Sequence, residues 1–145
     1  MVSAAHFGLL HEQENLMPFV HLALNRPNLP QTTVDELAKT VTDLLAQDFG
    51  KIARITVVHV DLVPSESWFV GSAQPDGVGG HLTVSLSTGI NTDTEKAVFI
   101  RHMYEALERI VGPLAEIFYI HVLEIPGKSW GYNGVPQADR TEDVD

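Results

Sequence analysis

The chain contains no cysteine and few basic residues. Without cysteine it can form neither a disulfide nor a thiolate metal site, and it has no thiol nucleophile. Its 9 Lys and Arg stand against 19 Asp and Glu, which gives a formal net charge of −10. No basic stripe can follow a phosphate backbone, so we expect no binding to nucleic acid. A chain without cysteine also suits a cytoplasmic location, which we expect here.

Long apolar runs and closely spaced metal ligands are missing as well. No segment approaches the roughly 20 apolar residues of a membrane span. The first sixteen residues lack the cationic start and the apolar run of a secretory signal, so we expect a soluble protein with no membrane partner. The seven histidines show neither HxH nor HxxxH spacing, and no metal site is predicted.

What the chain does contain is an internal repeat. Its 145 residues suffice for one domain with a sizeable core. A shift of 62 positions, which places Gly50 on Gly112, aligns the two halves without a gap and pairs both tryptophans. The other matched pairs are Leu24 and Leu86, Leu45 and Leu107, Ala53 and Ala115, Ile55 and Ile117, His59 and His121, Val60 and Val122, Pro64 and Pro126, Ser67 and Ser129, and Trp68 and Trp130.

Each half has the pattern of a strand, a helix and a second strand. The expected strands are residues 19–24, 55–63, 81–86 and 118–125, and apolar residues at helical spacing mark helices around 34–45 and 98–110. We expect Thr32 or Thr33 to cap the first helix, Thr92 or Thr94 to cap the second, and Gly50 and Gly112 to end them. This order predicts the same β-α-β unit twice.

Two such units joined edge to edge give an α+β fold. A strand, a crossover helix and a parallel strand pair with a right-handed connection. The result is a four-stranded mixed sheet with two helices on one face, whose other face is expected to be covered by neighbouring subunits. We assign residues 1–16 to an N-terminal extension, 17–134 to a single domain with repeats at 18–73 and 80–134 joined by the Gly-rich segment 74–80, and 135–145 to an acidic tail.

Several segments resemble the tautomerase superfamily. The run from Met17 to Val20 is similar to the Met-Pro-aliphatic start of its members, and both Gly50–Lys51 and residues 58–60 are similar to macrophage migration inhibitory factor, as is Tyr119 in its strand. Residues 125–131 resemble the last turn of relatives of 4-oxalocrotonate tautomerase. The two-unit length resembles the branch that includes cis-3-chloroacrylic acid dehalogenase. The resemblance covers about residues 17–134.

The resemblance implies a homotrimer with three active sites at subunit boundaries. It implies that each site uses an amino-terminal proline as a base on a small oxo or enol carboxylate, without a metal or an organic cofactor. The dehalogenase relatives carry a pair of arginines where this chain has Ser-Thr-Gly-Ile-Asn at residues 87–91. Dehalogenation of a haloacrylate is therefore not expected.

Pro18 is the residue that matches the catalytic proline, but seventeen residues precede it. A free prolyl amine starts from a pKa of about 8, and burial lowers it toward neutral pH, where it can act as a general base. Inside a chain the same nitrogen is an amide and cannot. Either translation begins at Met17, which is then removed, or the extension is real and the protein is processed or has lost this chemistry.

A purely structural reading of Pro18 is a proline that opens a strand at a sheet edge. The equivalent position in the second half is Gly80, so the fold does not demand proline there.

Binding of such a substrate needs cations for its carboxylate and donors for an enolate oxygen. Lys51 and Arg54 match substrate-binding positions of the resembling proteins, although Lys51 also suits the end of a helix. Arg26, after the first strand, is a weaker third choice. Tyr119 and His121 lie two apart in one strand and share a face, so either can donate, but the twin of His121 at His59 also favours a structural role.

Aromatic residues follow the last strand. Trp130 and Tyr132 lie in a Gly-rich loop and are expected to form a wall for a planar substrate, although Trp68 at the equivalent turn favours packing instead. We predict a cofactor-independent keto–enol tautomerase or isomerase with Pro18 and Tyr119 as catalytic residues, and with Lys51, Arg54, His121, Trp130 and Tyr132 as substrate-binding residues.

Two rival functions remain. A hydratase or decarboxylase would use the same site with Pro18 as a cation, and the missing arginine pair counts against it. A non-catalytic trimer would use Leu9, Leu10 and Leu16 of the extension to fill the pocket.

Overall fold

The two halves of the chain contain the same elements in the same order. The computed structural model describes residues 17–140. The first half consists of β1 (Phe19–Leu24), α2 (Gln31–Phe49) and β2 (Val57–Leu62), and the second of β3 (Gly80–Ser87), α3 (Asp93–Val111) and β4 (Tyr119–Ile125). Each helix has 19 residues, and the second begins 62 positions after the first. The duplicated β-α-β unit expected from the sequence is confirmed.

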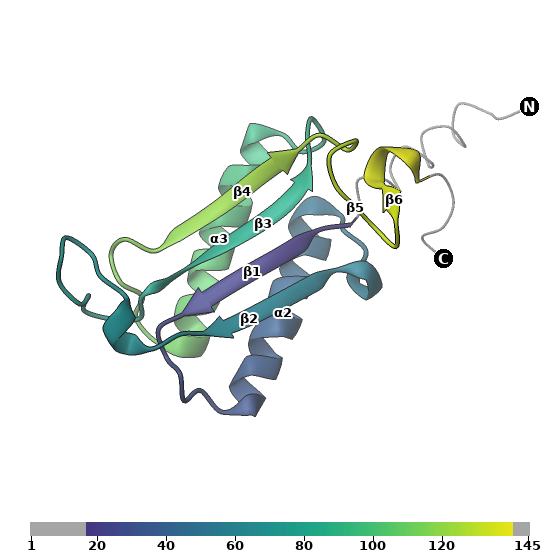
Figure 1. Ribbon diagram of the computed structural model, residues 1–145. Coiled ribbons are helices and arrows are strands. Elements are labelled where there is room, and N and C mark those ends of the chain that lie inside the picture. The colour runs from purple at the N-terminus through teal and green to yellow at the C-terminus, as the bar shows by residue number, and fades with distance from the viewer. Residues whose placement is uncertain (1–16, 141–145) are drawn as a thin grey trace, which may run out of the picture.

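The four strands form one mixed sheet in the order β2-β1-β3-β4. β1 pairs in parallel with β2, β3 pairs in parallel with β4, and the central pair of β1 and β3 is antiparallel. Phe19 lies opposite Val57 in the first half, and His81 lies opposite Tyr119 in the second, so the repeat is preserved down to the register. Both helices cover the same face of the sheet, as Figure 1 shows.

The core lies between this face and the helices. Alternate residues of the two central strands are fully or almost fully buried: Val20, Leu22, Leu24, Leu82, Val84 and Leu86. The rings of Phe49 on α2 and Phe99 on α3 stack at 4.6 Å and join the two helices. Neither helix of residues 17–140 is long and apolar enough to cross a membrane.

The two helices begin in different ways. Thr92 caps α3 in a capping box with Glu95, one of the two caps predicted for it. α2 has Pro30 as its N-cap and no side-chain cap, so the prediction of Thr32 or Thr33 is wrong. The Pro30 carbonyl accepts hydrogen bonds from the backbone amides of Thr33 and Val34, so the helix begins at Gln31 and both threonines lie within it. Gly50 ends α2 as predicted, in the left-handed conformation at φ 66°.

The C-terminal part of the described chain folds back onto the domain. β5 (Gly131–Tyr132) and β6 (Val135–Pro136) form a hairpin that is followed by a 3-10 turn, η3 (Gln137–Asp139). Asn133 and Gly134 have φ values of 52° and 78°, as a two-residue type I′ turn requires. Residues 135–140 are therefore structured, which corrects their assignment to a tail. Residues 141–145 and the extension 1–16 lie outside the described residues.

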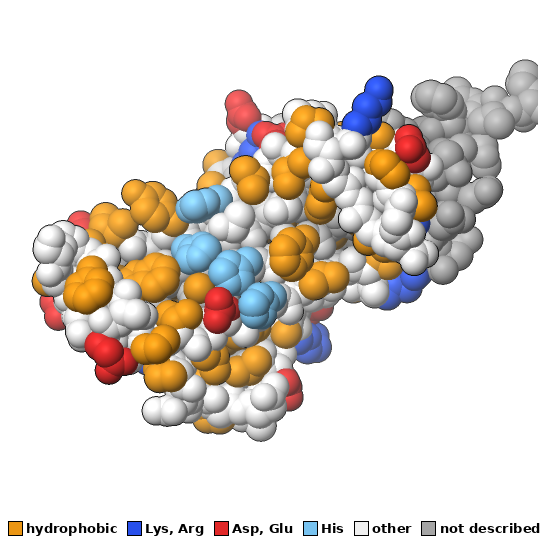
Figure 2. Space-filling model, in the orientation of Figure 1, with side chains coloured by type: hydrophobic (Ala, Val, Ile, Leu, Met, Phe, Trp, Pro, Cys, Tyr) orange, Lys and Arg blue, Asp and Glu red, His pale blue; other side chains and the backbone are white. Residues whose placement is uncertain are grey.

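The sheet face opposite the helices carries a row of four imidazoles, pale blue in Figure 2. From His59 through His21 and His81 to His121, successive ring centroids are 5.1, 5.2 and 6.1 Å apart. His21 Nε2 lies 3.0 Å from a carboxylate oxygen of Asp61. Within the described strands, Asp61 is the one Asp, Glu, Lys or Arg whose side chain lies on this face of the sheet. Exposed apolar side chains on the same face are Phe19, Val57, Tyr119 and Leu123. No three His, Asp or Glu of residues 17–140 are arranged as metal ligands.

Candidate active site

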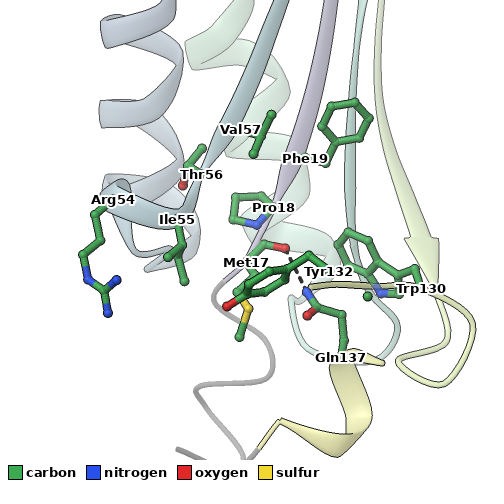
Figure 3. Close-up of a pocket in the computed structure, with 11 residues that line it drawn as sticks. Met17, Pro18, Phe19, Arg54, Ile55, Thr56, Val57, Trp130, Tyr132 and Gln137 are labelled. Atoms are coloured by element: carbon green, nitrogen blue, oxygen red, sulfur yellow. Dashed lines mark hydrogen bonds between the residues drawn. The ribbon is translucent and has the colours of Figure 1, made fainter. Parts of the chain in front are cut away.

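A cavity of about 440 Å³ surrounds the start of β1. It is bounded by that strand, by the η1 turn (Ala53–Ile55) with the start of β2, and by the C-terminal hairpin with η3, as Figure 3 shows. The residues that line it are Met17, Pro18, Phe19, Arg54, Ile55, Thr56, Val57, Trp130, Gly131, Tyr132 and Gln137.

Four of the residues predicted from the sequence meet in this cavity. Pro18 is buried at its base, and the Pro18 carbonyl accepts a hydrogen bond of 3.3 Å from the Val57 amide, which fixes it to β2. Arg54 is exposed and comes from η1 on one side, while Trp130 and Tyr132 come from the C-terminal segment on the other. The fold therefore brings a cation and two aromatic rings around Pro18 from three separate parts of the chain.

The interior of this cavity is mostly apolar. Two of the lining residues, Trp130 and Gln137, each have a buried polar atom with no hydrogen-bond partner within the described chain, Nε1 and Oε1 respectively. Buried polar groups are nearly always paired in folded proteins, so these two atoms are candidates for contacts that the described chain alone does not supply. An amine in these surroundings would lose hydration, which lowers its pKa.

Gln137 is a site residue that the sequence analysis missed. It is 1% exposed, and its Nε2 donates a hydrogen bond of 3.3 Å to the carbonyl oxygen of Met17. The acidic composition of the last residues led to their assignment to a tail. The Asn133–Gly134 pair is a strong hairpin signal and would have predicted that the chain turns back here.

Tyr119 and His121 do not line this cavity. They lie with Trp68, Gly80 and His81 around a second cavity of about 460 Å³ at the other end of the sheet. Phe19 pairs with Ser85 and Tyr119 pairs with His81. Ser85 and His81 are four residues apart on β3, which separates the two sites by about 13 Å along the strands. β1 and β4 are two strands apart in the sheet, which adds about 10 Å across the strands. Within one chain they cannot contact the same small substrate as Pro18.

The second cavity is the repeat counterpart of the first. Gly80 takes the place of Pro18, Tyr119 that of Val57, and Trp68 that of Trp130. Gly80 has a φ of 158°, whereas proline requires about −65°. A Cβ atom on Gly80 would also lie 2.0 Å from the carbonyl oxygen of Ala23. A proline therefore fits the first position of the repeat and not the second.

Lys51 and Arg26 also lie outside the cavity around Pro18. Lys51 follows Gly50 and is 4% exposed. Burial lowers the pKa of its ammonium group from 10.5 to about 8, while the nearby charge of Glu95 acts in the opposite direction. Arg26 stands at the far end of β1, where its Nη1 donates to the carbonyl and side-chain oxygens of Asn25.

Comparison with known proteins shows a likeness of structure without a match in sequence. No family model and no curated protein matches the chain. A native fused 4-OT matches with a TM-score of 0.74 and 16% identity, over 83% of this chain and 96% of that one. A macrophage migration inhibitory factor-like protein from Entamoeba histolytica matches with a TM-score of 0.67 and 17% identity, over 81% of this chain and 96% of that one. A member of the cis-3-chloroacrylic acid dehalogenase family matches with a TM-score of 0.70 and 16% identity, over 81% of this chain and 82% of that one.

These likenesses show that the chain has the same fold as the matched proteins, which is the fold that the sequence resemblance implied. Similar solved structures also include a malonate semialdehyde decarboxylase and asymmetric trimers of fused 4-OT. The structural neighbours are thus tautomerases, a dehalogenase-family member and a decarboxylase. At these identities the likeness concerns the fold, and the activity of this chain has to be argued from its own residues.

Proposed function

We propose that the chain is a cofactor-independent keto–enol tautomerase or isomerase of small α-oxo or enol carboxylates, with the free amine of Pro18 as its base. The observation that carries the proposal is the position of Pro18 at the base of an apolar cavity, with a cation and two aromatic rings around it. The enzymes of similar fold support an enzymatic function in general.

The proposed reaction moves one proton through the prolyl nitrogen. In a chain that begins at Pro18, the apolar walls favour the neutral amine, which takes a proton from the carbon next to the substrate carbonyl. The protonated amine then returns that proton to the other end of the enolate system. Arg54 pairs with the substrate carboxylate, and Nε1 of Trp130, which has no partner in the described chain, donates to the enolate oxygen.

The complete site further requires other copies of the chain. Tyr119 and His121 can act at Pro18 only from a neighbouring subunit, because they lie in the second cavity of their own chain. We infer a homotrimer in which the uncovered sheet face is enclosed, and the fused 4-OT trimers support this. Light scattering should then give three times the chain mass. A monomer at micromolar concentration would exclude a shared site.

The first experiment compares two forms of the chain, one that begins at Pro18 and one that begins at Met1, each verified by intact mass. Enol–keto conversion of enol-pyruvates is followed by absorbance. We expect the form that begins at Pro18 to be at least about 100-fold more active, because general acid–base catalysis contributes that much and an amide nitrogen cannot supply it. Equal activity of the two forms would rule out a prolyl base.

A second experiment tests the cation. In the form that begins at Pro18, Arg54→Ala should raise KM for a carboxylate substrate about 10-fold or more, because a charge-assisted pair is lost. Arg101→Ala is the matched control, since Arg101 is equally exposed but lies on α3, away from the cavity. The proposal for Arg54 fails if both variants behave alike.

Two other functions use the same cavity. In the uncut chain Met17 is buried and its carbonyl is bound by Gln137, which favours a non-catalytic trimer if residues 1–17 are retained in the native host. A hydratase or decarboxylase would use protonated Pro18, and product analysis with oxo and unsaturated acids separates it from a tautomerase. Cytoplasmic location and the absence of nucleic-acid and membrane partners stay predictions.

A further inference from the structure

The amide of Gln137 is held in a fixed position beside the Pro18 nitrogen. Its Nε2 donates to the Met17 carbonyl oxygen at 3.3 Å. That oxygen belongs to the peptide bond of Pro18 and lies about 2.2 Å from its nitrogen. Nε2 of Gln137 is therefore at most about 5.5 Å from the Pro18 nitrogen, the atom proposed as the base. Figure 3 shows the side chain rising from η3 toward Met17 and Pro18.

Several backbone contacts fix the segment that carries Gln137. The backbone N–H of Gln137 donates to the Trp130 carbonyl at 2.8 Å, and the backbone N–H of Ala138 donates to the Gly127 carbonyl at 2.9 Å. Arg140 lies with its guanidinium carbon 3.6 Å from the centroid of the Tyr132 ring and donates to the Tyr132 carbonyl. These contacts tie η3 to the hairpin, so the position of the Gln137 side chain is set by the fold.

The acceptor half of the same amide has no partner in the described chain. Gln137 is 1% exposed, and its Oε1 is buried without a hydrogen bond. Leaving a buried acceptor unpaired destabilises a folded protein. A glutamine has both a donor and an acceptor, so it can bind a carbonyl oxygen in one state of the chain and an N–H group in another.

We propose that Gln137 is a positioning residue for the prolyl base, and this inference rests on the proposed function of Pro18. When the chain begins at Pro18, the Met17 carbonyl is gone and Oε1 of Gln137 accepts a hydrogen bond from the prolyl N–H. The remaining lone pair, or the second proton of the ammonium form, then faces the substrate. In the uncut chain the same amide binds the Met17 carbonyl instead.

The proposal has a consequence for the pKa of the Pro18 amine. A hydrogen bond accepted from the ammonium form favours that form, so Gln137 should hold the amine pKa higher than the apolar walls alone would. Gln137→Met removes the acceptor at nearly the same length, and Gln137→Glu replaces it with a charge. In the chain that begins at Pro18, we expect the pKa to fall by about 1 unit with Met and to rise with Glu.

The pKa is measured by a pH titration of the Pro18 nitrogen resonance in chains with ¹⁵N-labelled proline. Gln47→Leu, on the exposed surface of α2, serves as the control and should leave the titration unchanged. The proposal is overturned if the pKa of Pro18 is the same with Gln, Met and Glu at position 137.

A measurement without substitution protects the test against variants that fail to fold. The side-chain amide resonances of Gln137 should titrate with Pro18 in the chain that begins at Pro18, and they should not titrate in the chain that begins at Met1. The proposal would also be overturned if the side-chain amide resonances of Gln137 did not shift as Pro18 titrates. A chain that shows this coupling but converts no enol-pyruvate would disprove the proposed function and leave the contact between Gln137 and Pro18 intact.

Discussion

Replacing Lys51 with methionine should change the stability of the protein in a pH-dependent way. Burial lowers the pKa of Lys51 from 10.5 to about 8, so the folded chain holds this proton less tightly than the unfolded chain. The unfolded state therefore binds more protons between pH 8 and 10.5, and stability rises with pH across that range. A difference of about 2.5 pH units corresponds to about 3 kcal/mol, which is the stability that the protein gains as the pH rises from below 8 to above 10.5.

We expect the free energy of unfolding of Lys51→Met, relative to wild type, to be about 3 kcal/mol higher at pH 7 than above pH 10.5. The difference between the two proteins should change above pH 8 and level off above pH 10.5, where the lysine is neutral in both states. Urea unfolding at pH 7, 8, 9 and 10 measures this at one fixed chain concentration, because assembly also affects stability. Lys39→Met, at a side chain 77% exposed, is the control. An advantage over wild type that is equal at pH 7 and pH 10 would refute the argument.

Three further predictions concern single residues. Gly80→Ala should destabilise the fold by roughly 2 kcal/mol or more, because its Cβ would overlap a carbonyl oxygen of β1, and thermal unfolding checks this. Thr92→Ala should cost about 1 kcal/mol by removing the capping box of α3, whereas Thr94→Ala, two residues later and exposed, should cost much less. His81 should titrate below its ordinary pKa in NMR, chiefly through burial, and His21→Gln should raise that pKa by removing a like charge; no change would contradict the row of imidazoles.

The repeat was the part of the fold that could be read most fully from the sequence. Because matched residues recur at one spacing, the order of elements, the pairing within each half and the common face of the helices all followed from it. The start of α2 did not, since the first helical hydrogen bond runs to the Pro30 carbonyl and places Thr32 and Thr33 inside the helix despite their capping preference.

The candidate site could be predicted only in part. Pro18 and Arg54 were predicted from the family resemblance, Trp130 and Tyr132 from their place in a Gly-rich loop, and all four meet in one cavity. Tyr119 does not join them within one chain, because a repeat places equivalent residues at opposite ends of the sheet. Spacing along the sequence cannot tell these two ends apart, since both are built from the same pattern.

The repeat cannot give the second half a reactive prolyl amine, because a proline at position 80 would lie inside the chain, where its nitrogen is an amide. The backbone at Gly80 also excludes the proline ring itself, so the start of β3 cannot copy the start of β1. A reagent that alkylates the prolyl amine should accordingly reach saturation at one equivalent per chain. The second cavity is thus free to differ from the first, and it carries His81 where the first half has Phe19.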